Sequence, residues 1–340
     1  MNNEFFIKIE NLKKYYPVNK GIKDIFNKEK KYVRAIDDIS FTINKGEILG
    51  LAGESGSGKT TTGEILVQLQ NMTEGSIIFD GYDFANRSKE ANKEFRKDVQ
   101  MIFQDPYETL NPRFTILETI AEPLKIFGMK DKNEIYKRAI EALEIAELKP
   151  AQQFAHRYPH ELSGGQRQRV AIARGIVVGP KFIVADEPVS MLDVSIRADI
   201  LNLLKNLRDK MGLTMLYVSH DLSTIKYLCD RIAVMYLGKI VEIGDAKEVI
   251  DHPQHPYTKV LLSSVPIADP DHIRERIEID DELPDQINLP EGCRFEPRCP
   301  YATEKCKKVD HTFFERRDKH WSACIYTDEE LKLKKKVNEV

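Results

Sequence analysis

The sequence predicts an α/β fold whose core is a parallel β-sheet with crossover helices. A Gly-rich loop stands between an apolar strand and the start of a helix at residues 47–61, EILGLAGESGSGKTT. Between residues 166 and 219 predicted helices and strands alternate, which is typical of parallel strands joined by helices. We therefore expect a sheet with helices on its faces and an anion-binding loop at one strand end.

Length and composition set limits on this fold. The chain has 340 residues, of which 41% are hydrophobic, so about two packed domains are expected. Its 51 Lys and Arg residues nearly balance its 54 Asp and Glu residues, and this balance predicts no nucleic-acid partner. No apolar run approaches the roughly 18 residues that cross a bilayer, and the N-terminus is charged throughout. We expect a cytoplasmic chain that reaches any membrane through a protein partner.

The other elements are predicted from hydrophobic periodicity. Short β-type runs come first, interrupted by a helical pattern at residues 60–69, and a purely helical pattern at 116–148 predicts an inserted helical subdomain. After residue 266 the composition turns to Asp, Glu and Pro, which predicts a linker. The expected strands span 5–10, 39–43, 48–52, 76–79, 99–103, 182–185 and 214–219, and the later helices span 166–177 and 195–210.

The Gly-rich loop fits the phosphate-binding pattern G-x-x-x-x-G-K-[ST] in full. Its glycines let successive backbone N–H groups face one anion, and the following helix adds its positive N-terminal end. Lys59 can reach the outer phosphates, and the Thr60 hydroxyl can hold Mg2+. A Gly-rich turn that matches by chance is the alternative. The residues expected to bind ATP here are Gly53, Ser55, Gly56, Ser57, Gly58, Lys59, Thr60 and Thr61.

A second anion site is predicted at residues 162–166, LSGGQ, which precede the helical run RQRVAIAR. A Ser hydroxyl and two Gly amides at a helix start can bind an anion, and one chain cannot easily close both sites on one ATP. Here the chain resembles the ABC ATPase family. The resemblance implies a head-to-tail dimer with two shared ATP molecules, the alternative being an ordinary turn and helix cap. The residues expected to bind the ATP of the opposite cassette are Ser163, Gly164, Gly165 and Gln166.

Catalytic residues are expected at the ends of two apolar strands. Asp186 and Glu187 end the run FIVADE, where the first acid can hold Mg2+ through water and the second can position the attacking water. Glu187 is the expected catalytic base. His220, directly after LTMLYVS, resembles the family's switch histidine, which senses the γ-phosphate. Without the other motifs, a lone histidine at a strand end would be interpreted as a satisfied polar group.

The resemblance extends to two residues on the ATP-binding side. Gln104 ends the run VQMIFQ and resembles the Q-loop glutamine, which reaches Mg2+ and the attacking water. It also begins the helical subdomain, so a surface near residues 104–125 is expected to push on a permease. Tyr16 resembles the aromatic residue that stacks on adenine, with the neighbouring Tyr15 as the alternative.

One further loop is expected to touch the partner cassette. Ser190 and Asp193 resemble the polar residues of that loop, although the family more often has Ala at the position of Met191. The family resemblance also implies the full fold class. It is a P-loop cassette with a RecA-like parallel sheet core, an antiparallel β subdomain and a helical subdomain at about 105–165, all within residues 1–265.

The last part of the chain carries four of its five cysteines, with the spacing Cys-x5-Cys-x6-Cys-x17-Cys. This spacing lacks the paired C-x2-C turns of common zinc ribbons, whereas four thiolates suit an iron–sulfur cluster. The segment GCRFEPRCPYATEKC resembles the C-terminal region of oligopeptide and dipeptide ABC importers, which implies a 4Fe-4S cluster in a small domain at 266–330; zinc and free thiols are the alternatives. Residues 331–340 form a charged tail. The expected ligands are Cys293, Cys299, Cys306 and Cys324.

The resemblance implies an ATP-hydrolysing subunit of an oligopeptide or dipeptide importer, at the cytoplasmic face of the membrane. The opening NLKKYYPVNKG looks like the second of the two ATPase subunits that such importers use. The implied partners are a similar or identical ATPase subunit, two membrane permease subunits and, indirectly, a solute-binding protein. The alternatives are an importer of nickel or oligosaccharides, a soluble ABC ATPase without a transport role, and a nucleotide-binding regulator.

Overall fold

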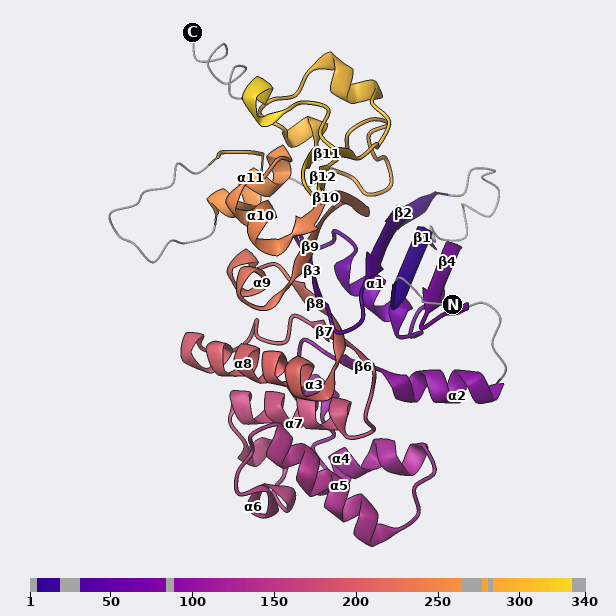
Figure 1. Ribbon diagram of the computed structural model, residues 1–340, viewed down its shortest axis with the longest axis vertical. Coiled ribbons are helices and arrows are strands. Elements are labelled where there is room, and N and C mark those ends of the chain that lie inside the picture. Colours follow the sequence, from indigo (N-terminus) through magenta and orange to yellow (C-terminus); the bar gives the residue numbers. More distant parts are fainter. Residues whose placement is uncertain (1–4, 19–30, 84–88, 265–276, 281–283, 332–340) are drawn as a thin grey trace.

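The computed structural model describes residues 5–18, 31–83, 89–264, 277–280 and 284–331. Its long axis runs from a bundle of helices, through a central sheet, to the C-terminal segment (Figure 1). A smaller sheet lies beside the central one and contains the N-terminal strand. None of the helices in these described ranges is long and apolar enough to cross a membrane.

The central sheet has eight strands within the described residues, in the order β11-β12-β10-β9-β3-β8-β7-β6. The five strands from β9 to β6 are parallel, and the other three extend the sheet by antiparallel pairing. The sequence predicted β3, β6, β7 and β8, whose apolar runs are mostly buried, but not the antiparallel extension. The strands are β3 (Ile48–Ala52), β6 (Val99–Ile102), β7 (Phe182–Asp186), β8 (Thr214–Ser219), β9 (Arg231–Tyr236), β10 (Lys239–Asp245), β11 (Phe314–Arg317) and β12 (His320–Ser322).

The smaller sheet is antiparallel, with the strand order β2-β1-β4-β5. Its first strand is longer than the sequence pattern predicted, because pairing with β2 continues to Pro17 and places Tyr16 opposite Val33. Apolar side chains of this sheet share a core with one face of the central sheet. The strands are β1 (Ile7–Pro17), β2 (Tyr32–Ile43), β4 (Glu74–Phe79) and β5 (Tyr82–Asp83).

Helices flank the central sheet. Helix α1 directly follows the Gly-rich loop. Hydrophobic periodicity predicts that this helix continues to residue 69, but it ends earlier because Gln68 adopts a left-handed conformation with φ of 57°. On the opposite side, α8 and α9 connect β7 to β8 and β8 to β9 as crossover helices. The helices are α1 (Lys59–Leu66), α2 (Lys89–Asp98), α8 (Val194–Met211), α9 (Leu222–Leu228), α10 (Ala246–Asp251) and α11 (Pro256–Ser263).

Helices α4 and α5 confirm the prediction that residues 116–148 are helical. Thr115 and Glu118 form a capping box at the start of α4, and Asp131 caps α5. Apolar residues on the facing sides, such as Ile120 and Leu143, are fully buried between the helices. The helices are α3 (Pro106–Thr109), α4 (Ile116–Ile126), α5 (Lys132–Ile145), α6 (Ala151–Ala155) and α7 (Gly164–Ile176), with a 3-10 turn η2 (Pro159–Glu161).

The C-terminal segment is packed onto the central sheet. Strand β12 pairs with β10, and two 3-10 helices, η3 (Glu296–Arg298) and η4 (Glu304–Lys308), precede this hairpin. The fully buried Glu242 of β10 accepts a hydrogen bond from the His320 ring at 2.7 Å and from the backbone N–H of His255 at 3.0 Å. The expected boundary at 265–266 and most of the expected tail at 331–340 lie outside the described residues.

Candidate active site

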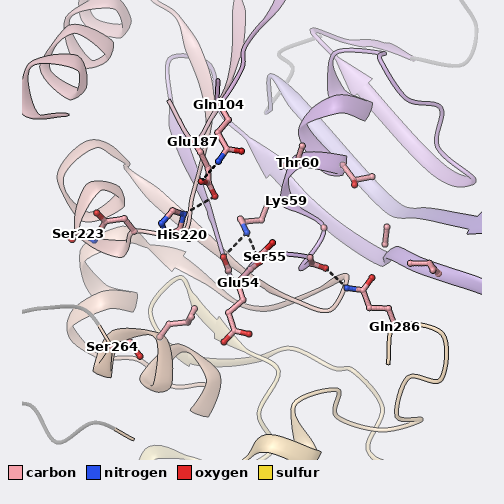
Figure 2. Close-up of a pocket in the computed structure, with 18 of the residues that line it drawn as sticks. Glu54, Ser55, Lys59, Thr60, Gln104, Glu187, His220, Ser223, Ser264 and Gln286 are labelled. Atoms are coloured by element: carbon pink, nitrogen blue, oxygen red, sulfur yellow. Dashed lines mark hydrogen bonds and ion pairs between the residues drawn. The ribbon is translucent and has the colours of Figure 1, made fainter. Parts of the chain in front are cut away.

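A cavity of about 1360 Å³ opens where the Gly-rich loop faces the C-terminal ends of β7 and β8 (Figure 2). Residues from nearly the whole length of the chain line it, from Tyr16 of β1 to Gln286 of the C-terminal segment. The parallel strands explain this convergence, because their carboxyl ends meet at one edge of the sheet and the loops that follow them face one space. Of the expected residues, the cavity is lined by Tyr16, Gly53, Ser55, Gly56, Gly58, Lys59, Thr60, Thr61, Gln104, Glu187 and His220.

The Gly-rich loop adopts a conformation that only glycine tolerates at two positions. Gly53 and Gly58 have φ values of 150° and 105°, and a Cβ atom at either would lie within 2.3 Å of a backbone carbonyl oxygen. Lys59 folds back over the loop, with its Nζ donating to the carbonyls of Gly53 at 2.7 Å and Glu54 at 2.8 Å. Burial lowers the pKa of Lys59, whose side chain is 5% exposed. Its ammonium therefore lies at the base of the loop with little water around it.

The loop presents different atoms to the cavity and to the interior. Ser55, Gly56 and Thr60 are exposed, whereas Ser57 is buried, and its hydroxyl lies 3.4 Å from the Lys59 ammonium. The first three residues of α1, Lys59, Thr60 and Thr61, line the cavity, so the N-terminus of this helix borders the same space. Backbone N–H groups and a helix N-terminus that converge on one cavity can bind a phosphate chain.

Asp186, at the end of β7, lies behind Thr60. Its Oδ1 accepts a hydrogen bond from Thr60 Oγ1 at 3.3 Å. Burial raises the pKa of Asp186 to about 6, although the Thr60 hydroxyl opposes this shift. A hydroxyl that faces a phosphate site, with a carboxylate hydrogen-bonded behind it, is a donor set that suits Mg2+, which binds through few protein oxygens and completes its shell with water and phosphate.

Glu187 connects the ends of three strands. Its carboxylate accepts from Gln104 Nε2 at 3.2 Å and contacts His220 Nδ1 at 3.0 Å (Figure 2). The backbone of Glu187 is left-handed, with φ of 43°, a conformation that non-glycine residues adopt mainly where the surrounding structure requires it. The three expected residues therefore meet around one carboxylate that faces the cavity.

The structure distinguishes the two tyrosines of β1. Tyr16 lines the cavity beside Val33 and Ala35 of β2. The Tyr15 hydroxyl instead donates a hydrogen bond to the partly buried carboxylate of Asp37. The alternation of side chains along a strand explains this difference.

The LSGGQ segment lies outside this cavity. Ser163 is the N-cap of α7, where its hydroxyl accepts from the Gln166 N–H at 3.3 Å while the Gln166 side chain accepts from the Ser163 N–H at 3.1 Å. Ser163 is exposed, and Gly164 and Gly165 form the first turn of the helix. This helix start is open to solvent within the single chain.

The loop after Glu187 joins the catalytic strand end to α8. The hydroxyl of Ser190 donates to the Glu187 carbonyl at 3.0 Å, and Asp193 is the exposed N-cap position of α8. Met191 and Val194 are also exposed, at 59% and 81%. The loop therefore presents both polar and apolar groups to solvent.

The four expected cysteine ligands line one small cavity beside Phe295 and His255. All four are free thiols, and burial raises the pKa of Cys293 to about 11 and that of Cys299 to about 12. No group of three or more His, Cys, Asp or Glu side chains within the described residues is arranged to hold a metal ion. The fifth cysteine, Cys229, is buried at the C-terminal end of α9.

Sequence reasoning missed several residues that line the nucleotide-sized cavity. Arg197 of α8 forms an ion pair with Asp221 at 3.3 Å, and both line the cavity together with Ser223. Ser264 and Gln286 approach from the C-terminal part of the chain. The residues near His220 could have been found from their position after β8, but no local pattern marks Gln286.

A Gly-rich phosphate loop, an acidic strand end and a glutamate held between a glutamine and a histidine define a nucleotide-hydrolysing cassette of the P-loop class. Residues 36–190 match the ABC transporter family, and residues 241–306 match the oligopeptide/dipeptide transporter C-terminal region. The chain belongs to the ABC transporter family, and the sequence identity to the relatives described next shows the same membership.

Two relatives and one solved structure illustrate the similarity. The oligopeptide transport ATP-binding protein AppF of Bacillus subtilis is 45% identical over 95% of this chain and 98% of its own length. The dipeptide transport ATP-binding protein DppF of Haemophilus influenzae is 44% identical over 93% of this chain and 95% of its own. The dimeric bacterial ABC transporter cassette MJ0796 aligns with a TM-score of 0.60 and 33% identity, covering 71% of this chain and 98% of MJ0796.

Proposed function

We propose that this chain is the ATP-hydrolysing subunit of an ABC importer for oligopeptides or dipeptides. Lys59, Thr60 and Glu187 line one cavity and Asp186 hydrogen-bonds to Thr60 from behind it, and this arrangement carries the proposal of ATP hydrolysis. The substrate class is supported by the names of the relatives and by the match of the C-terminal region. Nickel or oligosaccharides are the alternative cargoes.

The geometry of the site supports a role for each of its residues. The backbone N–H groups of the Gly-rich loop and the Lys59 ammonium bind the phosphates, while Tyr16 stacks on the adenine. Thr60, Gln104 and Asp186 would hold Mg2+, which when bound neutralises charge on the phosphate oxygens. Glu187 orients the attacking water and accepts its proton, and His220 fixes the Glu187 carboxylate and contacts the γ-phosphate.

We further propose that two cassettes form a head-to-tail dimer. Ser163, Gly164, Gly165 and Gln166 would then bind the ATP held by the partner, and Ser190 and Asp193 would contact that partner. The exposed N-terminus of α7, which lies outside the chain's own cavity, supports this role. The solved relative MJ0796 is also a dimer. The partner is an identical or similar ATPase subunit.

The dimer is proposed to act at the cytoplasmic face of the membrane on two permease subunits, with a solute-binding protein as the indirect partner. ATP-driven closure would rotate the helical subdomain, and the surface after Gln104 would transmit this motion. The proposed units are residues 1–265, with the helical subdomain at about 105–165, the C-terminal region at 266–330 and the tail at 331–340.

For the C-terminal region we propose a 4Fe-4S cluster bound by Cys293, Cys299, Cys306 and Cys324. The number and kind of these side chains match the ligands of such a cluster and all four line one cavity, although among the described residues they are not drawn together into a metal-binding group. Its proposed role is to order the segment, because the hydrolytic residues are complete without it. Iron and sulfide analysis of anaerobically purified protein tests the proposal: stoichiometric zinc, or no metal, would contradict it.

Purification from native membranes tests the transport role. The chain should co-purify with integral membrane permeases, and peptides presented by a solute-binding protein should stimulate its ATP hydrolysis. Recovery of an active ATPase without any membrane partner would favour a soluble ABC ATPase. Stimulation by nickel or oligosaccharide rather than peptide would correct the cargo.

A further inference from the structure

The C-terminal segment reaches the Gly-rich loop through an ion pair. Arg298 is the last residue of η3 and directly precedes Cys299. Its guanidinium contacts the Glu54 carboxylate with both terminal nitrogens, Nη1 to Oε2 at 2.9 Å and Nη2 to Oε1 at 3.5 Å. The side chain of Arg298 is 5% exposed and that of Glu54 is 27% exposed. A two-pronged pair with so little water is stronger than an ordinary surface ion pair.

Glu54 is the second residue of the loop and is held at three points. Its backbone N–H donates to the Tyr257 hydroxyl at 2.8 Å, and its carbonyl accepts from Lys59 Nζ at 2.8 Å. The third point is the ion pair with Arg298. Figure 2 shows the second of these contacts, between Glu54 and Lys59. A shift of the Glu54 side chain would therefore move the backbone that faces the phosphates and the carbonyl that orients Lys59.

Arg298 is itself fixed by contacts with the C-terminal segment and with β9 of the central sheet. Its Nε donates to the Asp280 carbonyl at 2.8 Å, and Nη1 lies 3.3 Å from the Tyr236 hydroxyl. The Tyr236 ring packs against Phe295 and Tyr257, with centroids 5.3 and 4.5 Å away. The guanidinium is therefore presented to Glu54 in one orientation.

A second contact supports the same connection. Gln286 Nε2 donates to the Gly56 carbonyl at 3.2 Å, on the rim of the cavity (Figure 2). Two side chains from the C-terminal segment thus contact the loop, one on each side of Ser55.

The negative charge of Glu54 lies next to the site that is proposed to bind phosphates, and the ion pair with Arg298 offsets this charge. A carboxylate beside a phosphate site repels the anionic ligand, and this repulsion is largest where water is scarce. We propose that Arg298 is a positioning residue for ATP binding, which neutralises Glu54 and holds the phosphate loop in its binding conformation. The C-terminal segment then sets the ATP affinity of the cassette, an inference that rests on the proposed function.

The test compares the purified full-length chain with its Arg298→Gln, Glu54→Gln and double variants. The Arg298→Gln variant leaves the Glu54 carboxylate without its ion-pair partner. The Kd and KM of this variant for MgATP should rise about tenfold, with kcat close to that of the wild type. The double variant, which lacks both charges, should recover an affinity within about threefold of Glu54→Gln alone, because the repulsion is gone. A purely structural role of Arg298 predicts no such recovery.

Arg317→Gln is the matched control, because Arg317 of the same segment pairs with Glu248 of α10 at 3.0 Å and does not reach the loop. It should leave the Kd for MgATP unchanged. An unchanged Kd in Arg298→Gln, or a double variant no better than Arg298→Gln, would overturn the inference. If Arg298→Gln does not fold, the test compares the double variant with Glu54→Gln alone. A double variant that binds MgATP tenfold more weakly than Glu54→Gln would overturn the inference. A wild-type chain that binds no ATP would refute the proposed function as well.

Discussion

Replacement of Lys59 by Met tests the phosphate site most specifically. Met has a similar length and fits the buried path of the Lys59 side chain, but it carries no charge. The ammonium is placed to make charge-assisted hydrogen bonds to phosphate oxygens, each worth about 1.5–3 kcal/mol. Two such bonds correspond to a loss of about 3 kcal/mol or more, so the Kd for MgATP should rise at least about 100-fold.

The cost to the fold should be smaller. The variant removes the donors to the carbonyls of Gly53 and Glu54, at about 1 kcal/mol each, and also removes a charge that burial disfavours. Equilibrium binding gives the affinity, and urea unfolding without nucleotide gives the stability. ATP should stabilise the wild type against unfolding but not Lys59→Met. A folded variant that binds ATP within threefold of wild type would refute the assigned role.

The remaining predictions concern the dimer and the pH dependence of stability. Ser163→Ala should lower hydrolysis at least about tenfold in a steady-state assay while the isolated chain binds ATP as wild type does, because Ser163 serves the partner's nucleotide; a matching loss of binding would contradict this. Burial lowers the pKa of His255 to about 3, from 6.5. Below pH 6.5 the histidine of the unfolded chain therefore binds a proton that His255 of the folded chain does not bind. The free energy of unfolding should decrease as the pH is lowered, by about 2 kcal/mol between pH 6.5 and pH 5. His255→Asn, which keeps a helix-capping acceptor, should lose this part of the slope in urea unfolding, and an unchanged slope would assign the proton uptake elsewhere.

Features that depend on neighbouring residues were predicted well from the sequence. The strand, Gly-rich loop and helix around Lys59 form one local unit, and the helical pattern of α4 and α5 carries its own caps. The parallel strands β7 and β8 are mostly apolar and are buried along their whole length, as strands covered on both faces are. Asp186 could be named because it ends β7, and Glu187 and His220 because they directly follow β7 and β8.

Features that depend on distant pairing could not be predicted. The extension of β1 to Pro17 comes from its register with β2, and β12 joins the sheet only through β10. Arg298 and Glu54 are 244 positions apart, and neither lies in a pattern that indicates the other. The sequence also could not distinguish Tyr15 from Tyr16, because the answer depends on which face of β1 meets the cavity.

The Glu187→Gln variant tests the central claim most directly. Gln keeps the size of the side chain and its contact with His220, but it cannot accept the proton of the attacking water. In the presence of MgATP, light scattering should report a stable dimer of Glu187→Gln, while hydrolysis falls at least about 100-fold. A variant that hydrolyses ATP at the wild-type rate, or one that binds ATP and stays monomeric, would contradict the account of a cassette that closes on two shared nucleotides.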